Sequence, residues 1–169
     1  SFIELKKQEK FSSLRLQIAG GMTSEDEPFV SEQRRKLEAA GLSEYISIRP
    51  NLTRVQKLEF LKNLTLFSVP ARYPEAFGLY VVEAMAAGVP VVLPNDGSFP
   101  EIIEATQGGY LYDPKEDGGL IRALELALCE PEKAKKMGLQ GHHSVKNNFA
   151  NEQLAVALVD QLLSPLQTS

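Results

Sequence analysis

The chain has 169 residues, of which 43% are apolar and 24% charged, which is enough to bury the core of one domain. Its formal net charge is −4, with lysine and arginine scattered, so the composition excludes the basic patch of a nucleic-acid-binding protein. No apolar stretch has the length of a membrane span. The single cysteine, Cys129, lies in an apolar helical pattern, which predicts a buried thiol and a cytoplasmic protein.

The first residues have the pattern of the second half of an amphipathic helix, with Phe2, Ile3 and Leu5 facing inward. In a parallel sheet a crossover helix follows a strand, so we expect a further strand upstream of this sequence. Three lysines of the segment fit its solvated face: Lys6, Lys7 and Lys10.

Five short runs have the composition of β-strands, and helical segments lie between them. The runs are residues 14–20, 45–49, 64–69, 89–93 and 109–112. The first long helix is expected between Pro28 and Gly41, and the next begins with Thr53 and Gln56 in capping-box spacing. This alternation predicts an α/β fold, a Rossmann-like parallel sheet of five strands with helices on both faces.

After Asp113 the pattern becomes helical, so the sheet is expected to end near Tyr112. We therefore predict one domain over residues 1–169. Its sheet would occupy residues 1–113, and residues 114–169 would form a helical C-terminal part.

Ligands of open parallel sheets bind beyond the carboxyl ends of the strands. These ends carry glycine, proline and short polar residues here, at residues 20–21, 49–51, 70–78 and 94–98. Taken singly, each of these loops is better explained as an ordinary turn than as a ligand-binding loop. The third loop is the exception, because it is long, precedes the most apolar helix and offers three hydrogen-bonding side chains: Arg72, Tyr73 and Glu75.

The apolar helix is expected to begin near Phe77 or Gly78 and to stop at Gly88. The free amides of its first turn, reinforced by the helix dipole, are suited to an anion. Glu75 is equally well explained as a helix cap or as a ligand-binding group. Glu83 stands in a helix that is predicted to be buried on most sides, so its carboxylate needs partners, which are either protein groups or ligand hydroxyls.

The two glutamates together fit a long ligand with hydroxyl groups at both ends and phosphates between them. A nucleotide sugar has this layout.

Residues 74–92, "PEAFGLYVVEAMAAGVPVV", resemble the E-x7-E segment of retaining glycosyltransferases of the GT-B fold, the family called glycosyl transferases group 1 (GT4). Three further blocks resemble this family in the same order and spacing: residues 14–21, 45–63 and 94–114. The resemblance implies the nucleotide-sugar-binding C-terminal half of a two-domain enzyme, whose acceptor-binding N-terminal domain is absent from this sequence.

The resemblance also implies roles for individual residues. Glu75 would be the catalytic-site glutamate beside the donor sugar, and Glu83 would bind the ribose hydroxyls. The backbone around the donor sugar and diphosphate would come from Phe77, Gly78, Leu79, Gly20 and Gly21. The nucleobase would face Arg49, Leu52 and Lys57. No metal and no cofactor is implied, because the nucleoside-diphosphate sugar is the substrate.

The sequence departs from the family pattern in two places. The arginine and lysine that hold the diphosphate would lie in a loop upstream of this sequence, so we expect this chain alone not to catalyse transfer. Ser98 stands where the family has the second glycine of a pair, which puts close backbone approach to the ligand there in doubt.

Two other functions stay open: a nucleotide-sugar epimerase of the same fold, and a nucleotide-binding module without activity. A peripheral membrane contact of the full-length enzyme also stays open. The two histidines, His142 and His143, are best explained as surface residues of a polar helix. The acidic residues Asp113, Glu116 and Asp117 are best explained as a loop and a helix start, and not as a metal site.

Overall fold

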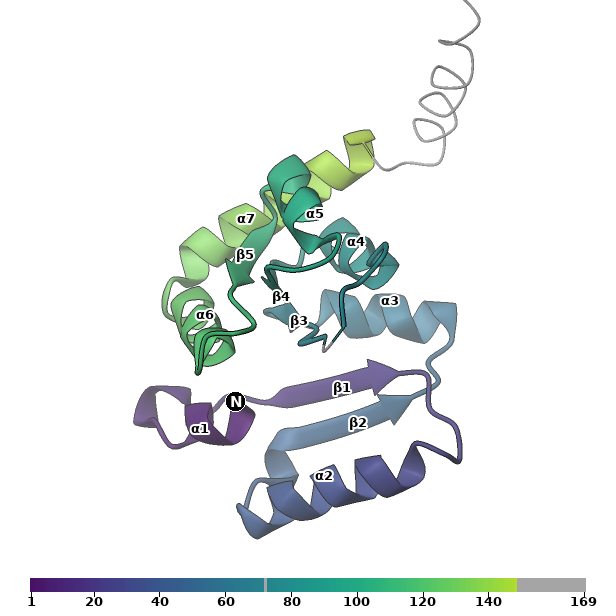
Figure 1. The fold of residues 1–169 in the computed structure, drawn as a ribbon, viewed down its shortest axis with the longest axis vertical. Coiled ribbons are helices and arrows are strands. Elements are labelled where there is room, and N and C mark those ends of the chain that lie inside the picture. The colour runs from purple at the N-terminus through teal and green to yellow at the C-terminus, as the bar shows by residue number, and fades with distance from the viewer. Residues whose placement is uncertain (72, 149–169) are drawn as a thin grey trace, which may run out of the picture. The chain divides into compact units, whose positions relative to one another are not determined.

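The computed structural model describes residues 1–71 and 73–148. The chain divides into two compact units, Ser1–Phe60 and Leu61–Ser169, and each is described by itself (Figure 1). Arg72 and residues 149–169 of the predicted helical part lie outside the described residues.

The first unit contains a two-stranded parallel sheet. Strand β1 (Leu16–Gly20) pairs with β2 (Ile46–Pro50), with Leu16 opposite Ile46 and Gly20 opposite Pro50. Its helices are α1 (Phe2–Lys6), α2 (Glu27–Ala39) and most of α3 (Arg54–Lys62), with short 3-10 turns at Glu9–Phe11 and Ser43–Tyr45.

The predicted helix boundaries of this unit are confirmed. Helix α2 has Pro28 in its first turn and is followed by Gly41, whose φ is +70°. The capping box of α3 is formed: the Thr53 amide donates to Gln56 Oε1 (2.9 Å), and the Gln56 amide donates to Thr53 Oγ1 (3.3 Å).

The second unit contains a three-stranded parallel sheet in the order β3-β4-β5. Its elements are β3 (Phe67–Ser68), α4 (Leu79–Ala86), β4 (Val91–Pro94), α5 (Phe99–Thr106), β5 (Gly109–Tyr112), α6 (Gly119–Cys129) and α7 (Pro131–Asn148). The central strand β4 is fully buried, and α6 packs on the face that carries Val92 through Ala123 and Ala127. Helix α7 packs against both α4 and α5.

The predicted α/β fold is confirmed, and its last strand ends at Tyr112 as expected. Within the first unit the backbone ladder joins β1 to β2, and within the second unit it joins β3 to β4 and β4 to β5.

Two predictions about single side chains are wrong. Cys129 is exposed, because Ala123 and Ala127 define the buried face of α6 and Cys129 lies about 200° around the helix from Ala127. Lys6 is half-buried, with its ammonium nitrogen 3.3 Å from the centre of the Tyr45 ring, whereas Lys7 and Lys10 are exposed as predicted.

Asn51 ties the loop after β1 to the loop after β2. Its Nδ2 donates to the Met22 carbonyl and its Oδ1 accepts from the Met22 amide, both at 2.9 Å. Its own amide donates to the Gly20 carbonyl (2.9 Å). The φ of Asn51 is +54°, a left-handed conformation that asparagine adopts more readily than most residues.

We predict that Asn51→Gly lowers the free energy of unfolding by about 1 kcal/mol, because the side-chain bonds to Met22 are lost. Asn51→Ala should lower it by about 2 kcal/mol, because alanine also disfavours the left-handed backbone. Urea denaturation monitored by circular dichroism measures both values. Equal stability of the two variants would show that the left-handed backbone is not a constraint here.

Candidate functional site

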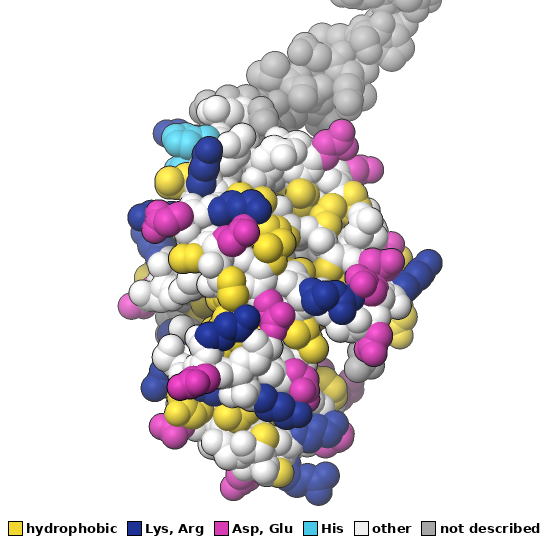
Figure 2. Space-filling model, turned by 90° about the vertical axis from the view of Figure 1, so that its left-hand side faces the viewer, with side chains coloured by type: hydrophobic (Ala, Val, Ile, Leu, Met, Phe, Trp, Pro, Cys, Tyr) yellow, Lys and Arg dark blue, Asp and Glu magenta, His cyan; other side chains and the backbone are white. Residues whose placement is uncertain are grey.

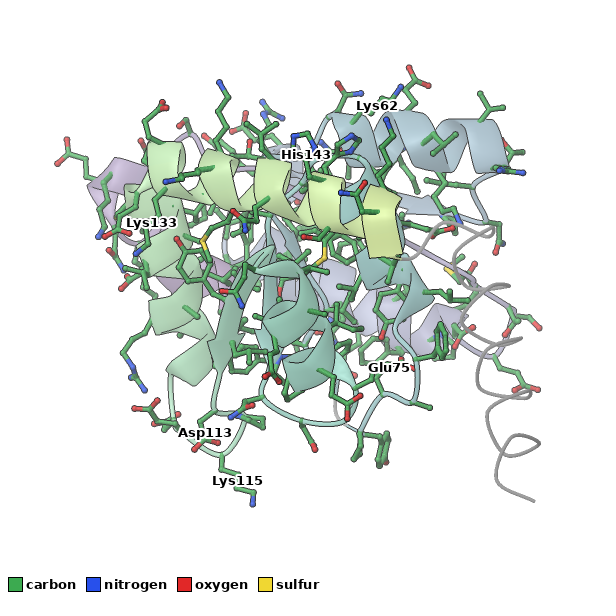
Figure 3. The ribbon with its side chains drawn as sticks, turned by 90° about the horizontal axis from the view of Figure 1, so that it is seen from above. Lys62, Glu75, Asp113, Lys115, Lys133 and His143 are labelled. Carbon is green, nitrogen blue, oxygen red and sulfur yellow. The ribbon has the colours of Figure 1, made fainter. Side chains whose placement is uncertain are left out.

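The candidate site lies at the carboxyl ends of β3 and β4, where residues 69–78 lead into α4 and residues 95–98 lead into α5. Figure 3 shows Glu75 at this end of the second unit, with Asp113 and Lys115 projecting from the loop after β5. This is the edge where ligands of parallel sheets bind.

The Glu75 carboxylate is held by three donors within its own loop and helix. Oε2 accepts a 2.5 Å hydrogen bond from the Tyr80 hydroxyl. Oε1 accepts from the amides of Ala76 (3.1 Å) and Phe77 (3.4 Å). Half-buried Glu75 therefore acts as an anchor of the loop, which is the capping role that the sequence left open.

These contacts set the protonation of both side chains. The hydrogen bond from Tyr80, followed by that from the Phe77 amide, lowers the pKa of Glu75. Burial, followed by the bond to Glu75, raises the pKa of Tyr80 far above its usual value. At neutral pH Glu75 is consequently a carboxylate and Tyr80 a neutral phenol.

The loop of Glu75 is bonded to the loop after β4. The Ser98 amide donates to the Glu75 carbonyl (2.8 Å). A Cβ atom on Gly97 would lie 2.5 Å from the Glu75 nitrogen and 2.6 Å from its oxygen, and the φ of Gly97 is +58°. Only glycine fits at this position, because both the space and the backbone conformation exclude a side chain.

Ser98 follows this glycine at the start of α5. Its backbone makes the bond to the Glu75 loop, so a serine here is compatible with close approach of the two backbones. Its Oγ is enclosed and has no hydrogen-bond partner among the described residues.

Helix α4 begins after Gly78, which has φ +65° and packs tightly under α5: a Cβ there would lie 3.1 Å from Phe99 Cε1. The first amides of a helix have no acceptor within the helix, so those at Leu79 and Tyr80 point into the loop region. Phe77 and Leu79 are 62% and 63% exposed, so their side chains lie outside the core. The amide of Leu79 can therefore be offered to a ligand, whereas that of Phe77 donates to Glu75 in this structure.

Glu83 lies half-buried in the second turn of α4. The buried face of the helix consists of Val81, Ala84 and Met85. The prediction that the helix is buried on most sides is confirmed, because only Leu79 and Ala86 are exposed and they leave one side of it open.

The remaining predicted residues lie in the first unit. Gly20 and Gly21 are exposed, and a Cβ on either would meet no atom within 4 Å. Neither has a positive φ, so neither packing nor backbone conformation requires glycine there. Arg49, Leu52 and Lys57 are half-buried. The sequence did not reveal the role of Asn51, which joins the loop after Gly21 to the loop that contains Leu52 through its bonds to Met22.

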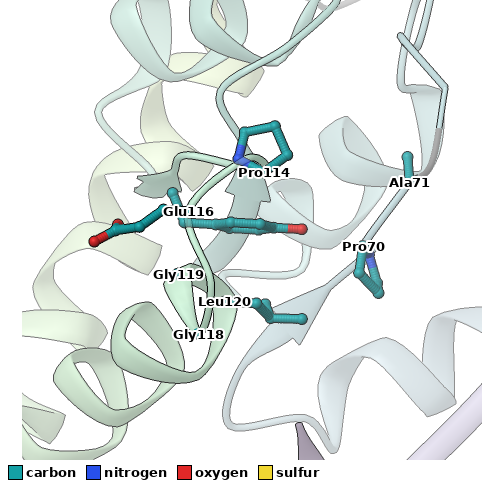
Figure 4. Close-up of a pocket in the computed structure, with 8 residues that line it drawn as sticks. Pro70, Ala71, Pro114, Glu116, Gly118, Gly119 and Leu120 are labelled. Atoms are coloured by element: carbon teal, nitrogen blue, oxygen red, sulfur yellow. The ribbon is translucent and has the colours of Figure 1, made fainter.

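A cavity of about 410 Å³ opens at the carboxyl ends of β3 and β5 (Figure 4). Its lining residues are Pro70, Ala71, Tyr112, Pro114, Glu116, Gly118, Gly119 and Leu120. No predicted site residue lines it. Burial raises the pKa of the Tyr112 hydroxyl, which is therefore neutral at physiological pH.

Among residues 1–71 and 73–148, no group of three histidine, cysteine or acidic side chains is placed to hold a metal ion. No described helix has the length and apolar character needed to cross a membrane. On the face drawn in Figure 2, acidic and basic side chains alternate without a large basic patch.

Comparison with known proteins decides the family. The model of the family "Glycosyl transferases group 1" matches residues 1–144. The chain belongs to this family. It is 30% identical over 141 residues to the lipopolysaccharide core biosynthesis mannosyltransferase LpcC of Rhizobium leguminosarum bv. viciae, an alignment that covers 83% of the chain and 39% of LpcC.

Solved structures of glycosyltransferases share the fold. The C-terminal domain of a glycosyl transferase group 1 family protein from Francisella tularensis superposes with a TM-score of 0.74 at 24% identity, covering 87% of this chain and 74% of that domain. Anabaena HepE in complex with UDP superposes with a TM-score of 0.72 at 20% identity, covering 87% of this chain and 41% of HepE. This group 1 chain thus spans about two fifths of LpcC and of HepE.

We predict that Tyr80→Phe raises the pKa of Glu75 toward that of a free glutamate, because its strongest donor is removed. The lowered pKa stabilises the fold above the pKa of the unfolded chain, and this contribution is lost as the pH falls through the folded value. The variant should therefore lose less stability on acidification than the wild type does. Carbon-13 NMR titration of the Glu75 carboxyl follows the shift, and identical midpoints in both proteins would contradict it.

We predict that Gly97→Ala lowers the free energy of unfolding by about 3 kcal/mol or more, because a methyl group strikes the Glu75 backbone. Gly41→Ala is the matched control, since Gly41 also has a positive φ but open space around it. Its cost should be about 1 kcal/mol. Guanidinium denaturation compares them, and equal losses would mean that the contact with Glu75 is not tight.

Proposed function

We propose that this chain is the nucleotide-sugar-binding half of a GT-B glycosyltransferase, which moves a sugar from a nucleoside diphosphate to an acceptor with retention of configuration. The observation that carries the proposal is the position of Glu75 just before the N-terminus of α4, at the carboxyl edge of a parallel sheet, with Glu83 in the second turn of the same helix. The fold similarity to HepE, which was crystallised with UDP, supports a nucleotide ligand.

Glu75 would serve both the loop and the donor sugar. A carboxylate has about four acceptor positions. Tyr80 and the amides of Ala76 and Phe77 donate to this one, and the Gly78 amide also lowers its pKa. A sugar hydroxyl would therefore replace one of the longer amide contacts, such as that of Phe77 at 3.4 Å. Because Glu75 is ionised at neutral pH, its charge would also favour positive character on the anomeric carbon.

The start of α4 would stabilise the leaving group. During transfer the bond between the anomeric carbon and the phosphate oxygen breaks, and the electron pair stays on the oxygen. The acceptor oxygen bonds to the carbon, and its proton is released. The Leu79 amide, with the dipole of α4, would oppose the charge that develops on the diphosphate. The amides of Phe77 and Gly78, which face the Glu75 carboxylate here, would turn from it to join them.

The nucleoside would lie further from the reacting carbon. Glu83 would accept hydrogen bonds from the ribose hydroxyls. Gly20 and Gly21 would leave room for the phosphates, which accounts for glycine where nothing in the fold requires it. The base would lie against the loop from Arg49 to Leu52, with Lys57 beside it, and Asn51 would fix the shape of that loop.

The rest of the enzyme would come from further sequence. We propose that residues 1–169 act as one donor-binding domain, with the sheet in 1–113 and a helical part in 114–169. A further parallel strand would pair with an open edge, and an acceptor-binding domain would complete the active site in a cytoplasmic enzyme, with or without peripheral membrane contact. The chain alone would then be inactive.

Nucleotide binding by the full-length protein tests this proposal. Titration calorimetry with UDP, GDP and ADP should show binding of at least one. Glu83→Gln should weaken that binding about 10- to 100-fold, because hydrogen bonds to a charged group contribute about 1.5–3 kcal/mol.

Glu104→Gln is the matched control, since Glu104 is exposed on α5, and it should bind like the wild type. Failure of the wild-type protein to bind any of the three nucleotides would overturn the donor-site proposal. Unchanged binding by Glu83→Gln would overturn only the role of Glu83.

A further inference from the structure

The backbone of helix α7 packs closely against the C-terminal end of α4. A Cβ atom on Gly138 would lie 2.3 Å from the Gly88 carbonyl oxygen, and one on Gly141 would lie 3.3 Å from Met85 Cγ. The two glycines are three residues apart on α7, so they face the same way. Helix α7 therefore has a smooth surface at the point where α4 ends.

The carbonyl groups at the end of α4 are all bonded. Those of Glu83, Ala84 and Met85 accept from the amides of the residues that follow the helix: Ala87, Val89 and Gly88 respectively. The fourth belongs to Ala86, the last residue of α4, and it lies 2.7 Å from His142 Nδ1. A side chain of α7 thus completes the C-terminal cap of α4.

This contact selects one tautomer of the His142 ring. A carbonyl oxygen only accepts hydrogen bonds, so Nδ1 must carry the proton. The neutral ring is consequently the Nδ1–H tautomer. Its neighbour His143, which Figure 3 labels on α7, is exposed, and its ring lies edge-on to that of His142 with 5.8 Å between centroids.

We propose that His142 is a positioning residue for the donor site, because its Nδ1–H holds the Ala86 carbonyl and thereby sets the position of α4. Helix α4 is about 12 Å long at 1.5 Å per residue. A displacement of its C-terminal end would therefore also move the residues at its N-terminal end. Glu83 lies one turn before Ala86. At the opposite end, Gly78 is wedged against Phe99 and Ile102, at 3.1 and 3.3 Å from the site of a Cβ. The inference rests on the proposed function, since α4 carries the proposed donor site.

The test uses the full-length protein and begins without a nucleotide. Nitrogen-15 NMR of the wild type should show His142 as the Nδ1–H tautomer at high pH, where the ring is neutral. Hydrogen exchange of the α4 amides should become up to about tenfold faster in His142→Ala, because one hydrogen bond contributes about 1 kcal/mol.

His142→Asn should restore slow exchange, because its side-chain amide places a donor near the position of Nδ1. Lys146→Ala, which removes an exposed side chain from the same helix, is the matched control and should leave exchange unchanged. An Nε2–H tautomer in the wild type, or equal exchange in His142→Ala and the wild type, would overturn the proposal. The tautomer alone can overturn the proposal even where His142→Ala does not fold.

Titration with UDP then tests whether the position of α4 affects nucleotide binding. His142→Ala should weaken UDP binding several-fold, and His142→Asn should recover it. Unchanged UDP binding with faster exchange would overturn the link to the donor site. If the wild type binds neither UDP nor the other nucleotides, the proposed function fails, while the exchange result still decides whether His142 holds α4.

Discussion

The candidate site depends on one backbone contact, the hydrogen bond from the Ser98 amide to the Glu75 carbonyl. It joins the loops that follow two neighbouring strands, and it exists only because Gly97 leaves room for the Glu75 backbone. With this contact in place, the Glu75 carboxylate lies beside Tyr80 and the first turn of α4. The geometry of the site is thus fixed by backbone packing before any ligand arrives, which is what a site for a charged transition state requires.

Both ends of α4 are held by other elements of the second unit. At the N-terminus Gly78 packs under α5, and at the C-terminus His142 of α7 bonds to Ala86. A short helix has little intrinsic stability, so its position is set by such tertiary contacts. This explains why a polar, lysine-rich helix such as α7 can matter for a site that it does not line.

Much of the fold could be predicted because the signals are local. The capping box of Thr53 and Gln56 and the stop at Gly41 follow from neighbouring residues, and both are present. The contact of Gly97 with Glu75 could not be predicted, since it joins loops that are distant in sequence. The role of Asn51 had one weak signal, an asparagine in a loop that needs a left-handed residue.

Periodicity alone does not show which face of a helix is covered. Cys129 shares a helix with buried alanines but faces away from them. The run around Glu83 is apolar in sequence, yet one side of α4 is open. Composition shows that a segment is apolar, but the neighbouring elements decide which of its faces are covered.

The central claim is that a nucleoside diphosphate sugar binds over the start of α4. A crystal structure of the full-length protein with its donor nucleotide tests this most directly. We expect the diphosphate within hydrogen-bond distance of the amides at Gly78 and Leu79, and the ribose hydroxyls on Glu83. A diphosphate bound instead in the cavity beside Pro70 and Tyr112, with Glu83 making no contact, would contradict the claim.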